Sequence, residues 1–344
     1  MSERIARLRE RLDTPFLVSN GTNLAYLTGF HSSNAALLVE PDRLRLFTDF
    51  RYLEGARRVE GVEIVETKRN LYRSLAEALD GSLAFEATDL TYDRWETLRD
   101  GGIELIPTRG VVEELRARKD EGELAAIRRA SEITTRGLER LAEETFVGRT
   151  ERDLAWTLER FLREEGAEGL AFEIAIGSGP NGASPHGDPG DRVVEAGELV
   201  VVDVGARADG YCSDCTRTFA TGELPDEAAR TYEVCLDAQL RSLAATRAGA
   251  VGRDVDAVAR DVIVAAGYGD QFGHGLGHGV GLMVHEAPTL RPESEDVLAP
   301  GNVVSVEPGI YLPGRFGVRI EDLVVVTEGE PEVLTGFPKE LRTV

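Results

Sequence analysis

Cysteine is scarce in this sequence, with three residues, Cys212, Cys215 and Cys235, among 344. Three thiols cannot all pair within one chain, and disulfides are uncommon in reducing compartments. A small secreted protein stabilised mainly by disulfides is therefore excluded. We expect three reduced cysteines in a cytoplasmic protein.

Long apolar runs are missing as well, since no stretch approaches the roughly 20 apolar residues that span a membrane. Residues 1–13 mix charges with Ile5, Leu8 and Leu12 at helical spacing, unlike the apolar core of a signal peptide. We therefore expect no membrane as a partner.

Lysine is the rarest charged residue. Of 39 basic residues only Lys68, Lys119 and Lys339 are lysines and the rest are arginines, against 61 acidic residues and a net charge of −22. Phosphate backbones would be repelled, which argues against nucleic acid as a partner. The excess of acid and arginine resembles halophilic proteins, in which salt screens the repulsion between carboxylates. High-GC genomes also favour arginine, so both origins stay open.

Two domains are expected from the length, because 344 residues exceed the usual size of one core. In the first part of the chain, short apolar runs alternate with charged helical stretches. The pattern predicts strands at 16–20, 35–40, 44–50, 62–67, 82–88 and 103–108, and helices near 51–59, 70–80 and 91–99. We infer an α/β domain over residues 1–118.

The second part, residues 119–344, alternates helices and hairpins in blocks. The expected helices are 123–144, 150–165, 226–247 and 253–266, and the expected strands are 171–177, a hairpin at 198–220 and a strand-rich end from Val303. Such blocks fit an α+β domain better than a doubly wound sheet.

Asp203 and Asp214 fall on the two strands of the predicted hairpin. Side chains alternate along a strand, so Asp203 shares a face with Val201, and Asp214 with Thr216. The two carboxylates could therefore converge. An isolated Asp more often ends a strand or caps a turn, but Asp203 follows an apolar run and would place its charge near a core, where an unpaired charge is costly.

Cys212 and Cys215 have the CxxC spacing of some zinc and thioredoxin-like sites. The sequence has no second CxxC pair, and strand alternation sends the two thiols to opposite faces. We therefore expect no metal at these cysteines.

Three of the five histidines, His274, His278 and His285, crowd into a segment with glycines at 273, 275, 277, 279 and 281. No stable helix carries glycine at this density, so the segment is predicted to be extended. The even-numbered residues from His274 to Leu282 would then face one way, and the bare glycine side would admit another backbone or a ligand. A lone histidine is usually structural, but this crowding predicts a site.

Glu307 and Glu321 each interrupt an apolar strand near the carboxyl terminus, with Arg319 on the face of Glu321. Taken singly, Glu307 could end a strand, and Arg319 and Glu321 could form an ion pair. Four carboxylates in strand interiors would repel one another by about 4 kcal/mol per close pair at an intermediate dielectric. Carboxylates with one imidazole suit two ions of Mn, Co or Zn, which remove that repulsion, polarise a carbonyl and activate a water.

The chain resembles the creatinase and aminopeptidase family of "pita-bread" metallopeptidases (M24), in its Xaa-Pro dipeptidase and Xaa-Pro aminopeptidase branch. The resemblance rests on NLAYLTGFHSSNAALLV, LRARKDEGELAAIRRA, HGLGHGVGLMVHE, SVEPGIY and RIEDLVVVTEG. It implies a creatinase-like N-terminal α/β domain at 1–118, a pita-bread catalytic domain at 119–344 and a homodimer. It also implies two divalent ions, manganese before cobalt or zinc, on five ligands: Asp203, Asp214, His278, Glu307 and Glu321.

The resemblance further implies roles for the residues around the metal. His186 would flank the pocket, and His274 and His285 would orient the substrate and stabilise the tetrahedral intermediate. Glu307 would shuttle a proton, and Arg319 would support the metal cluster or meet the substrate. His31 is expected to be structural, or to reach the pocket of a neighbouring subunit.

The implied reaction is hydrolysis of the bond between an N-terminal residue and proline, in Xaa-Pro dipeptides or short peptides. Proline forms a tertiary amide without an N–H, which peptidases that need this donor handle poorly. A methionine aminopeptidase shares the fold and ligands but not the N-terminal α/β domain. Creatinase-type hydrolases work without metal, and non-catalytic pita-bread modules typically lose ligands. The choice between dipeptidase and aminopeptidase stays open.

Overall fold

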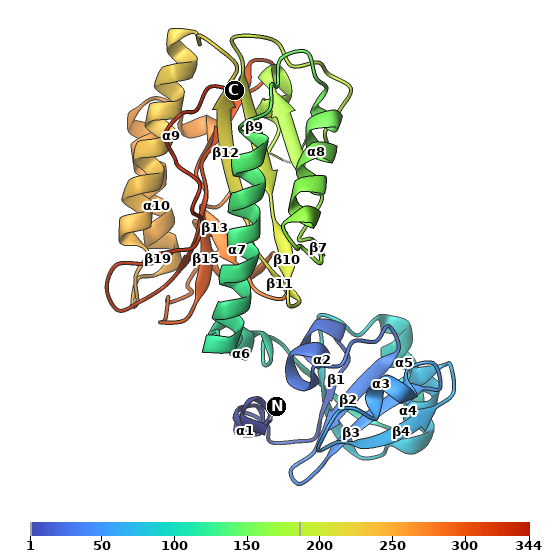
Figure 1. The fold of residues 1–344 in the computed structure, drawn as a ribbon. Coiled ribbons are helices and arrows are strands. Elements are labelled where there is room, and N and C mark those ends of the chain that lie inside the picture. The colour runs from blue at the N-terminus through green and yellow to red at the C-terminus, as the bar shows by residue number, and fades with distance from the viewer. Residues whose placement is uncertain (1, 186) are drawn as a thin grey trace. The chain divides into compact units, whose positions relative to one another are not determined.

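The structure, a computed structural model, describes residues 2–185 and 187–344 (Figure 1). The chain divides into two compact units, Met1–Arg116 and Ala117–Val344. Among the described residues, no helix combines the length and apolar character needed to cross a membrane.

The first unit is built on one six-stranded mixed sheet with the order β4-β3-β2-β1-β5-β6. Its strands are β1 (Phe16–Val18), β2 (Ala35–Val39), β3 (Leu44–Asp49), β4 (Glu63–Thr67), β5 (Ser82–Glu86) and β6 (Glu104–Thr108). Its helices are α1 (Ser2–Arg9), α2 (Gly21–Thr28), α3 (Leu53–Ala56), α4 (Leu71–Ala78), α5 (Tyr92–Asp100) and α6 (Glu113–Ala117), the last ending just past the unit. The six predicted strands and the three predicted helices are confirmed within a few residues.

Helix α2 was missed by the sequence reasoning, because its apolar residues directly follow the strand at Phe16. The side chain of Asn20 caps it by accepting hydrogen bonds from the backbone N–H groups of Thr22 (2.9 Å) and Asn23 (3.0 Å). Gly29 ends it in the left-handed conformation with φ of 72°. A capping Asn and a terminal Gly are the local signals that could have found this helix.

The second unit has four long helices: α7 (Glu121–Leu141), α8 (Glu151–Glu164), α9 (Asp226–Ala245) and α10 (Gly252–Ala265). One sheet has the order β12-β9-β8, and another has the order β14-β13-β15-β18-β19. Their strands are β8 (Ala175–Ser178), β9 (Leu199–Val204), β12 (Cys215–Ala220), β13 (Gly277–Gly279), β14 (Glu286–Leu290), β15 (Val303–Val306), β18 (Asp322–Val325) and β19 (Glu332–Val333). Smaller sheets join β7 (Gly169–Leu170), β10 (Ala206–Ala208) and β11 (Tyr211–Cys212), and pair β16 (Gly309–Leu312) with β17 (Phe316–Arg319).

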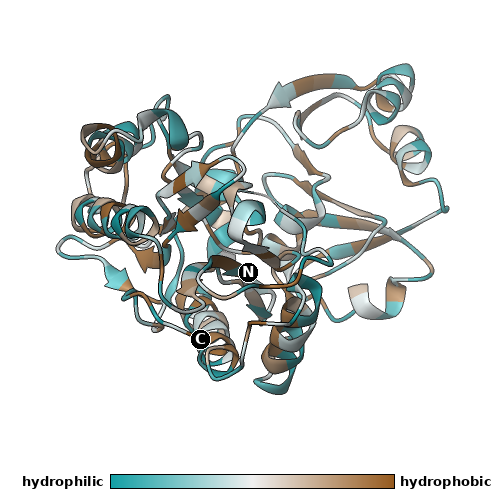
Figure 2. Cartoon of the chain, turned by 90° about the horizontal axis from the view of Figure 1, so that it is seen from above, coloured by the Kyte–Doolittle hydropathy of each residue, from teal (hydrophilic) through white to brown (hydrophobic). Residues whose placement is uncertain are grey.

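Each helix pair covers its own sheet. One core joins α7 and α8 to β8, β9 and β12 through residues such as Leu158, Val202 and Phe219. A second core joins α9 and α10 to β15 and β18 through residues such as Ile263 and Val304. The helices carry both brown and teal residues in Figure 2, as amphipathic helices with one face on a core do. The unit is α+β, as predicted.

The predicted hairpin at 198–220 is broken in the middle. Strand β9 pairs with β12, while β10 pairs with β11 in a different sheet. A Cβ at Gly205, between β9 and β10, would lie 2.1 Å from the carbonyl oxygen of Ser213, so only glycine allows this close approach. The break leaves Asp214 outside both strands, directly before β12. The strand expected at 171–177 forms only in its last part, as β8, and the short strand β7 lies before the predicted range.

Candidate active site

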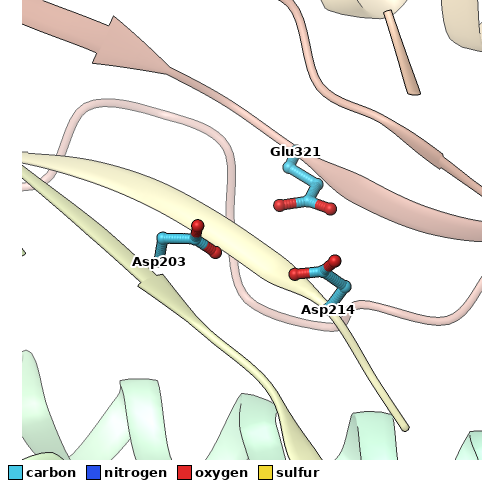
Figure 3. Close-up of side chains that lie close together, drawn as sticks. All are labelled: Asp203, Asp214 and Glu321. Atoms are coloured by element: carbon cyan, nitrogen blue, oxygen red, sulfur yellow. The ribbon is translucent and has the colours of Figure 1, made fainter. Parts of the chain in front are cut away.

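Three carboxylates of the second unit point toward one another (Figure 3). Asp203, Asp214 and Glu321 each offer one oxygen, and these oxygens all lie within 4.8 Å of one another. Asp203 comes from β9, Asp214 precedes β12, and Glu321 precedes β18. Segments more than a hundred residues apart thus meet at one acidic cluster.

The expectation that all four carboxylates sit in strand interiors is wrong. Only Asp203 does; Asp214 and Glu321 directly precede strands, and Glu307 directly follows β15. A strand interior in this unit is packed on an apolar core, where a charge is costly. The strand ends, in contrast, open toward a common cleft.

The cluster has the chemistry of a cation site. Oδ1 of Asp203 and Oε1 of Glu321 are buried and have no hydrogen-bond partner within the described part of the chain. Burial and the neighbouring carboxylates raise the pKa of Asp214 and of Glu321 well above the usual range. A divalent cation would be bound by the unused oxygens and would remove the repulsion between the carboxylates, so these residues fit a metal.

His278 and Glu307 lie at the edge of this cluster. Nε2 of His278 is 3.1 Å from Oε1 of Glu307 and 3.8 Å from Oδ2 of Asp214. Nδ1 lies 3.2 Å from the carbonyl oxygen of Gly279, an arrangement that places the proton on Nδ1 and leaves Nε2 free to bind a metal. The hydroxyl of Ser305 donates to Oε1 of Glu307 (2.9 Å) and fixes its orientation.

Burial lowers the pKa of the His278 imidazole, but the hydrogen bond and charge of Glu307, the charge of Glu321 and the contact with the Gly279 carbonyl together outweigh it and raise this pKa to about 9. Burial likewise opposes ionisation of Glu307, yet the His278 contact holds its pKa down to about 2. In the protein without metal, the two groups are therefore a half-buried ion pair over the neutral range.

Arg319 supports the cluster from the side. Its Nη2 donates to Oδ2 of Asp203 (2.5 Å), and its Nε donates to Oγ1 of Thr216 (3.0 Å). Thr216 in turn donates to Oε2 of Glu321 (2.8 Å). The remaining contacts of Arg319 also go to protein groups, which favours a supporting role over direct contact with substrate.

Tyr311, on β16, was missed by the sequence reasoning because GIYL has the pattern of an apolar strand. Nδ1 of His274 lies 2.8 Å from the carbonyl oxygen of Gly275, so Nε2 accepts the hydrogen bond from the Tyr311 hydroxyl (3.0 Å). That hydroxyl also accepts from Nη1 of Arg319 (2.9 Å). A buried tyrosine needs a partner for its hydroxyl, which is the one local signal for this role.

The cluster opens into a cleft of about 380 Å³. His274, His278 and His285 all line it, and the rings of His278 and His285 pack edge to face with centroids 4.3 Å apart. His186 lies outside the described residues, and His31 is an exposed residue of the first unit. Cleft residues that sequence reasoning did not single out are Phe172, Pro185, Val284, Thr289 and Arg291.

The glycine-rich segment meets other backbone closely, as predicted. A Cβ at Gly277 would lie 2.1 Å from the carbonyl oxygen of Ser305. The prediction of one common face is wrong, because Leu276 packs in the core under α9 and α10 while Val280 packs in a cluster with α7. A register shift between His278 and Gly279 breaks the alternation.

The loop that carries Pro185 is tied down by a buried carboxylate. Oε1 of Glu151 accepts hydrogen bonds from the backbone N–H (2.8 Å) and hydroxyl (2.7 Å) of Ser178, and Oε2 accepts from the N–H of Gly190 (3.1 Å). The carbonyl oxygen of Pro185 accepts from Nη1 of Arg319 (3.1 Å). Glu151 therefore fixes both ends of a loop that reaches the cluster.

The cysteines take no part in the cleft. Cys212 packs with Leu124 and Val280, and Cys215 packs in the core with Phe219, so the two thiols lie in separate clusters. Both are buried free thiols, as is Cys235. Burial raises the pKa of all three thiols, which keeps them protonated.

Comparison with known proteins agrees with this architecture. Residues 125–328 match metallopeptidase family M24, and residues 4–118 match the creatinase/prolidase N-terminal domain. An Xaa-Pro dipeptidase of Pyrococcus furiosus is 34% identical over 350 residues, covering 99% of this chain and 100% of that protein.

Solved structures extend the comparison. An Xaa-Pro dipeptidase from Bacillus anthracis superposes with a TM-score of 0.96 at 39% identity, covering 100% of this chain and 99% of the other. An X-Pro aminopeptidase from Thermotoga maritima superposes with a TM-score of 0.89 at 36% identity, covering 98% and 99%. Together with the match over more than half of its length, these relationships show that the chain belongs to metallopeptidase family M24 and carries that family's creatinase/prolidase N-terminal domain.

Proposed function

We propose that this peptidase hydrolyses the bond between an N-terminal residue and proline, with two divalent ions held by Asp203, Asp214, His278, Glu307 and Glu321. The observation that carries the proposal is the cluster of Asp203, Asp214 and Glu321, whose oxygens include two buried atoms without a hydrogen-bond partner among the described residues. Such a donor set is costly without cations. Relatives with Xaa-Pro names extend over the whole chain.

Two ions at this site would polarise the scissile carbonyl and lower the pKa of a water. The protein groups then divide the remaining work. Glu307, oriented by Ser305, is placed to accept a proton from the attacking water and pass it to the leaving nitrogen. His285 and His274 line the cleft where the substrate would lie, and His285 can donate to its oxygens. Both ring nitrogens of His274 bind protein groups, Gly275 and Tyr311, so His274 would orient the substrate as part of the cleft wall.

Proline selectivity has a physical basis in the same cleft. Phe172, Val284 and the ring of His285 offer apolar surface that fits a pyrrolidine ring. A tertiary amide brings no N–H, so the site needs no acceptor for one. Recognition of proline therefore depends on shape.

The finer assignments follow from the same proposal. We assign manganese before cobalt or zinc, since hard carboxylate oxygens outnumber the single imidazole. We also propose a cytoplasmic, salt-adapted homodimer, with the creatinase-like domain at 1–118 and the catalytic domain at 119–344. The three free cysteines support the cytoplasmic location, and the excess of acidic residues supports the adaptation to salt.

The alternatives have less support. A methionine aminopeptidase is not favoured, because residues 4–118 match the creatinase/prolidase N-terminal domain. A non-catalytic binding module is expected to lose ligands, and all five are present here.

The test is hydrolysis of Ala-Pro and Ala-Pro-Ala by chelator-stripped protein, with and without Mn²⁺, in high-salt buffer. Metal-dependent cleavage of Ala-Pro alone identifies a dipeptidase, and cleavage of Ala-Pro-Ala an aminopeptidase. Met-Ala-Ala serves as the control substrate. Cleavage of the control but of neither proline peptide would contradict the proposal.

A further inference from the structure

Arg217 is a buried arginine directly behind the carboxylate cluster, with 2% of its surface exposed. It follows Thr216 on β12, and because side chains alternate, it points away from the cluster that Thr216 faces. All three guanidinium nitrogens donate to protein acceptors. These are the carbonyl oxygens of Thr216 (3.0 Å), Glu321, Phe337 (2.6 Å) and Pro338 (3.0 Å), and Oδ1 of Asp322 (2.9 Å).

Asp322 completes a buried charged network on this side of the strand. Its Oδ1 accepts from Arg217 and from the hydroxyl of Thr335 (2.7 Å). Its Oδ2 accepts from the amide of Gln239 (3.0 Å) and from Nζ of Lys339. Both carboxylate oxygens are thus fully used, which is the condition under which a buried ion pair is tolerated.

Glu321 is therefore held from two sides. On the cleft side, its Oε2 accepts from the hydroxyl of Thr216 (2.8 Å). Its own N–H donates to the carbonyl oxygen of Thr216 (3.1 Å), and its own carbonyl oxygen accepts from Arg217 behind. A small rotation of this backbone would move the carboxylate of Glu321 within the cluster, so the contacts of Arg217 set its position.

The other end of the network is the C-terminal segment. Arg217 binds two consecutive carbonyl oxygens, of Phe337 and Pro338, and Asp322 binds Thr335 and Lys339. The ring of Phe337 packs on that of Phe219 with centroids 5.7 Å apart. This segment, residues 335–339, therefore packs against β12.

We infer that Arg217, together with residues 335–339, positions Glu321 for the metal, so that the C-terminal segment of the chain sets metal affinity. The inference rests on the proposed function, since it takes Glu321 as a ligand. Arg217 is a positioning residue, because its donors bind the backbone around Glu321 and the cleft lies on the other side. Removal of partners that orient metal ligands typically lowers metal affinity by about 10- to 100-fold.

The experiment measures Mn²⁺ affinity of chelator-stripped full-length protein by calorimetry, at a temperature where circular dichroism shows each variant folded. The variants are Arg217→Met, Lys339→Met and Thr335→Val. Ile263→Ala is the control, since it removes buried side-chain volume from α10 without touching the network. We expect Kd for Mn²⁺ to rise about 10- to 100-fold in Arg217→Met. Smaller rises are expected in the other two, and none in the control.

Wild-type affinity in a folded Arg217→Met variant would overturn the inference. If that variant does not fold, Lys339→Met and Thr335→Val decide, and unchanged Kd in both has the same meaning. An equal rise in Ile263→Ala would show that affinity only follows stability, and would also overturn it. If the wild type itself binds none of Mn²⁺, Co²⁺ or Zn²⁺, the proposed function fails instead, and the inference with it.

Discussion

Nε2 of His278 lies 3.1 Å from Oε1 of Glu307, and the contact keeps both groups charged in a half-buried position when no metal is bound. It raises the pKa of the imidazole to about 9 although burial works against the charge. The two ligands therefore neutralise each other without a metal, and the imidazole of His278 must lose its proton before it can bind one.

Metal binding should release protons. Ligands bind as neutral imidazole and ionised carboxylate, while His278, with a pKa of about 9, is protonated at pH 7 in the metal-free protein. We expect about one proton or more to be released per protein, and Mn²⁺ affinity to rise with pH up to about 9. Calorimetric titrations at pH 7 in phosphate and in Tris measure this release. Equal binding enthalpies in the two buffers, after dilution correction, would contradict it.

The metal-free protein should lose stability as pH rises from neutral to alkaline. His278 has a folded pKa above its unfolded value, so its contribution is complete below about 6.5 and is lost through about 9. Glu86, in the first unit, has its pKa raised by burial to about 7 and acts in the same direction. Thermal unfolding of stripped protein at pH 6 and pH 9 tests the sign, and added Mn²⁺ should remove most of the difference. A higher Tm at pH 9 without metal would show the opposite linkage.

His278→Ala and Glu321→Ala should abolish activity with little change in fold. Each removes a proposed ligand, and loss of the several kcal/mol that a metal supplies lowers kcat/KM by about 10³-fold or more. Metal content after dialysis and far-ultraviolet circular dichroism are measured beside the rate. Arg128→Gln, which breaks an exposed ion pair with Glu332, is the control. Near-normal turnover with metal retained in either variant would refute the ligand assignment.

Tyr311→Phe should lower kcat more than it changes metal content. The change removes the hydroxyl that lies between Arg319 (2.9 Å) and His274 (3.0 Å), and with it the two hydrogen bonds that orient these side chains. If their loss raises the barrier by about 1–3 kcal/mol, kcat falls by about 5- to 150-fold. Tyr92→Phe, at an exposed tyrosine, is the matched control. A tenfold rise in KM at unchanged kcat would instead place the hydroxyl in substrate binding.

Salt should stabilise the protein. The net charge of −22 produces self-repulsion that molar KCl screens, since the Debye length falls to about 3 Å at 1 M. Tm and Ala-Pro hydrolysis are compared in dilute buffer and in molar KCl, with sucrose as a control for solvent exclusion. Equal Tm and equal activity in dilute buffer and in molar KCl would reject the halophilic interpretation and leave genome composition as the reason for the arginine excess.

Local pattern predicted most elements because the periods of strands and helices are written in neighbouring residues. The six strands of the first unit were found this way, and so were α7 to α10. Prediction from local pattern failed where a single backbone contact overrides that pattern. Gly205 breaks the hairpin because Ser213 lies against it, and the bulge after His278 splits an expected common face. Neither neighbour can be identified from the sequence around the glycine.

The sequence by itself determined which residues could carry the chemistry: acidic side chains beside apolar runs, and histidines among glycines. Charge beside an apolar run is costly wherever the chain folds, so the signal is local. Only the tertiary structure decided which of these groups meet. It brought Asp203, Asp214 and Glu321 together, used the donors of Arg319 on protein groups, added Tyr311, and placed Arg217 and the C-terminal segment behind Glu321. Those contacts join segments that are far apart in the chain, and the spacing of residues along a sequence does not predict which segments converge.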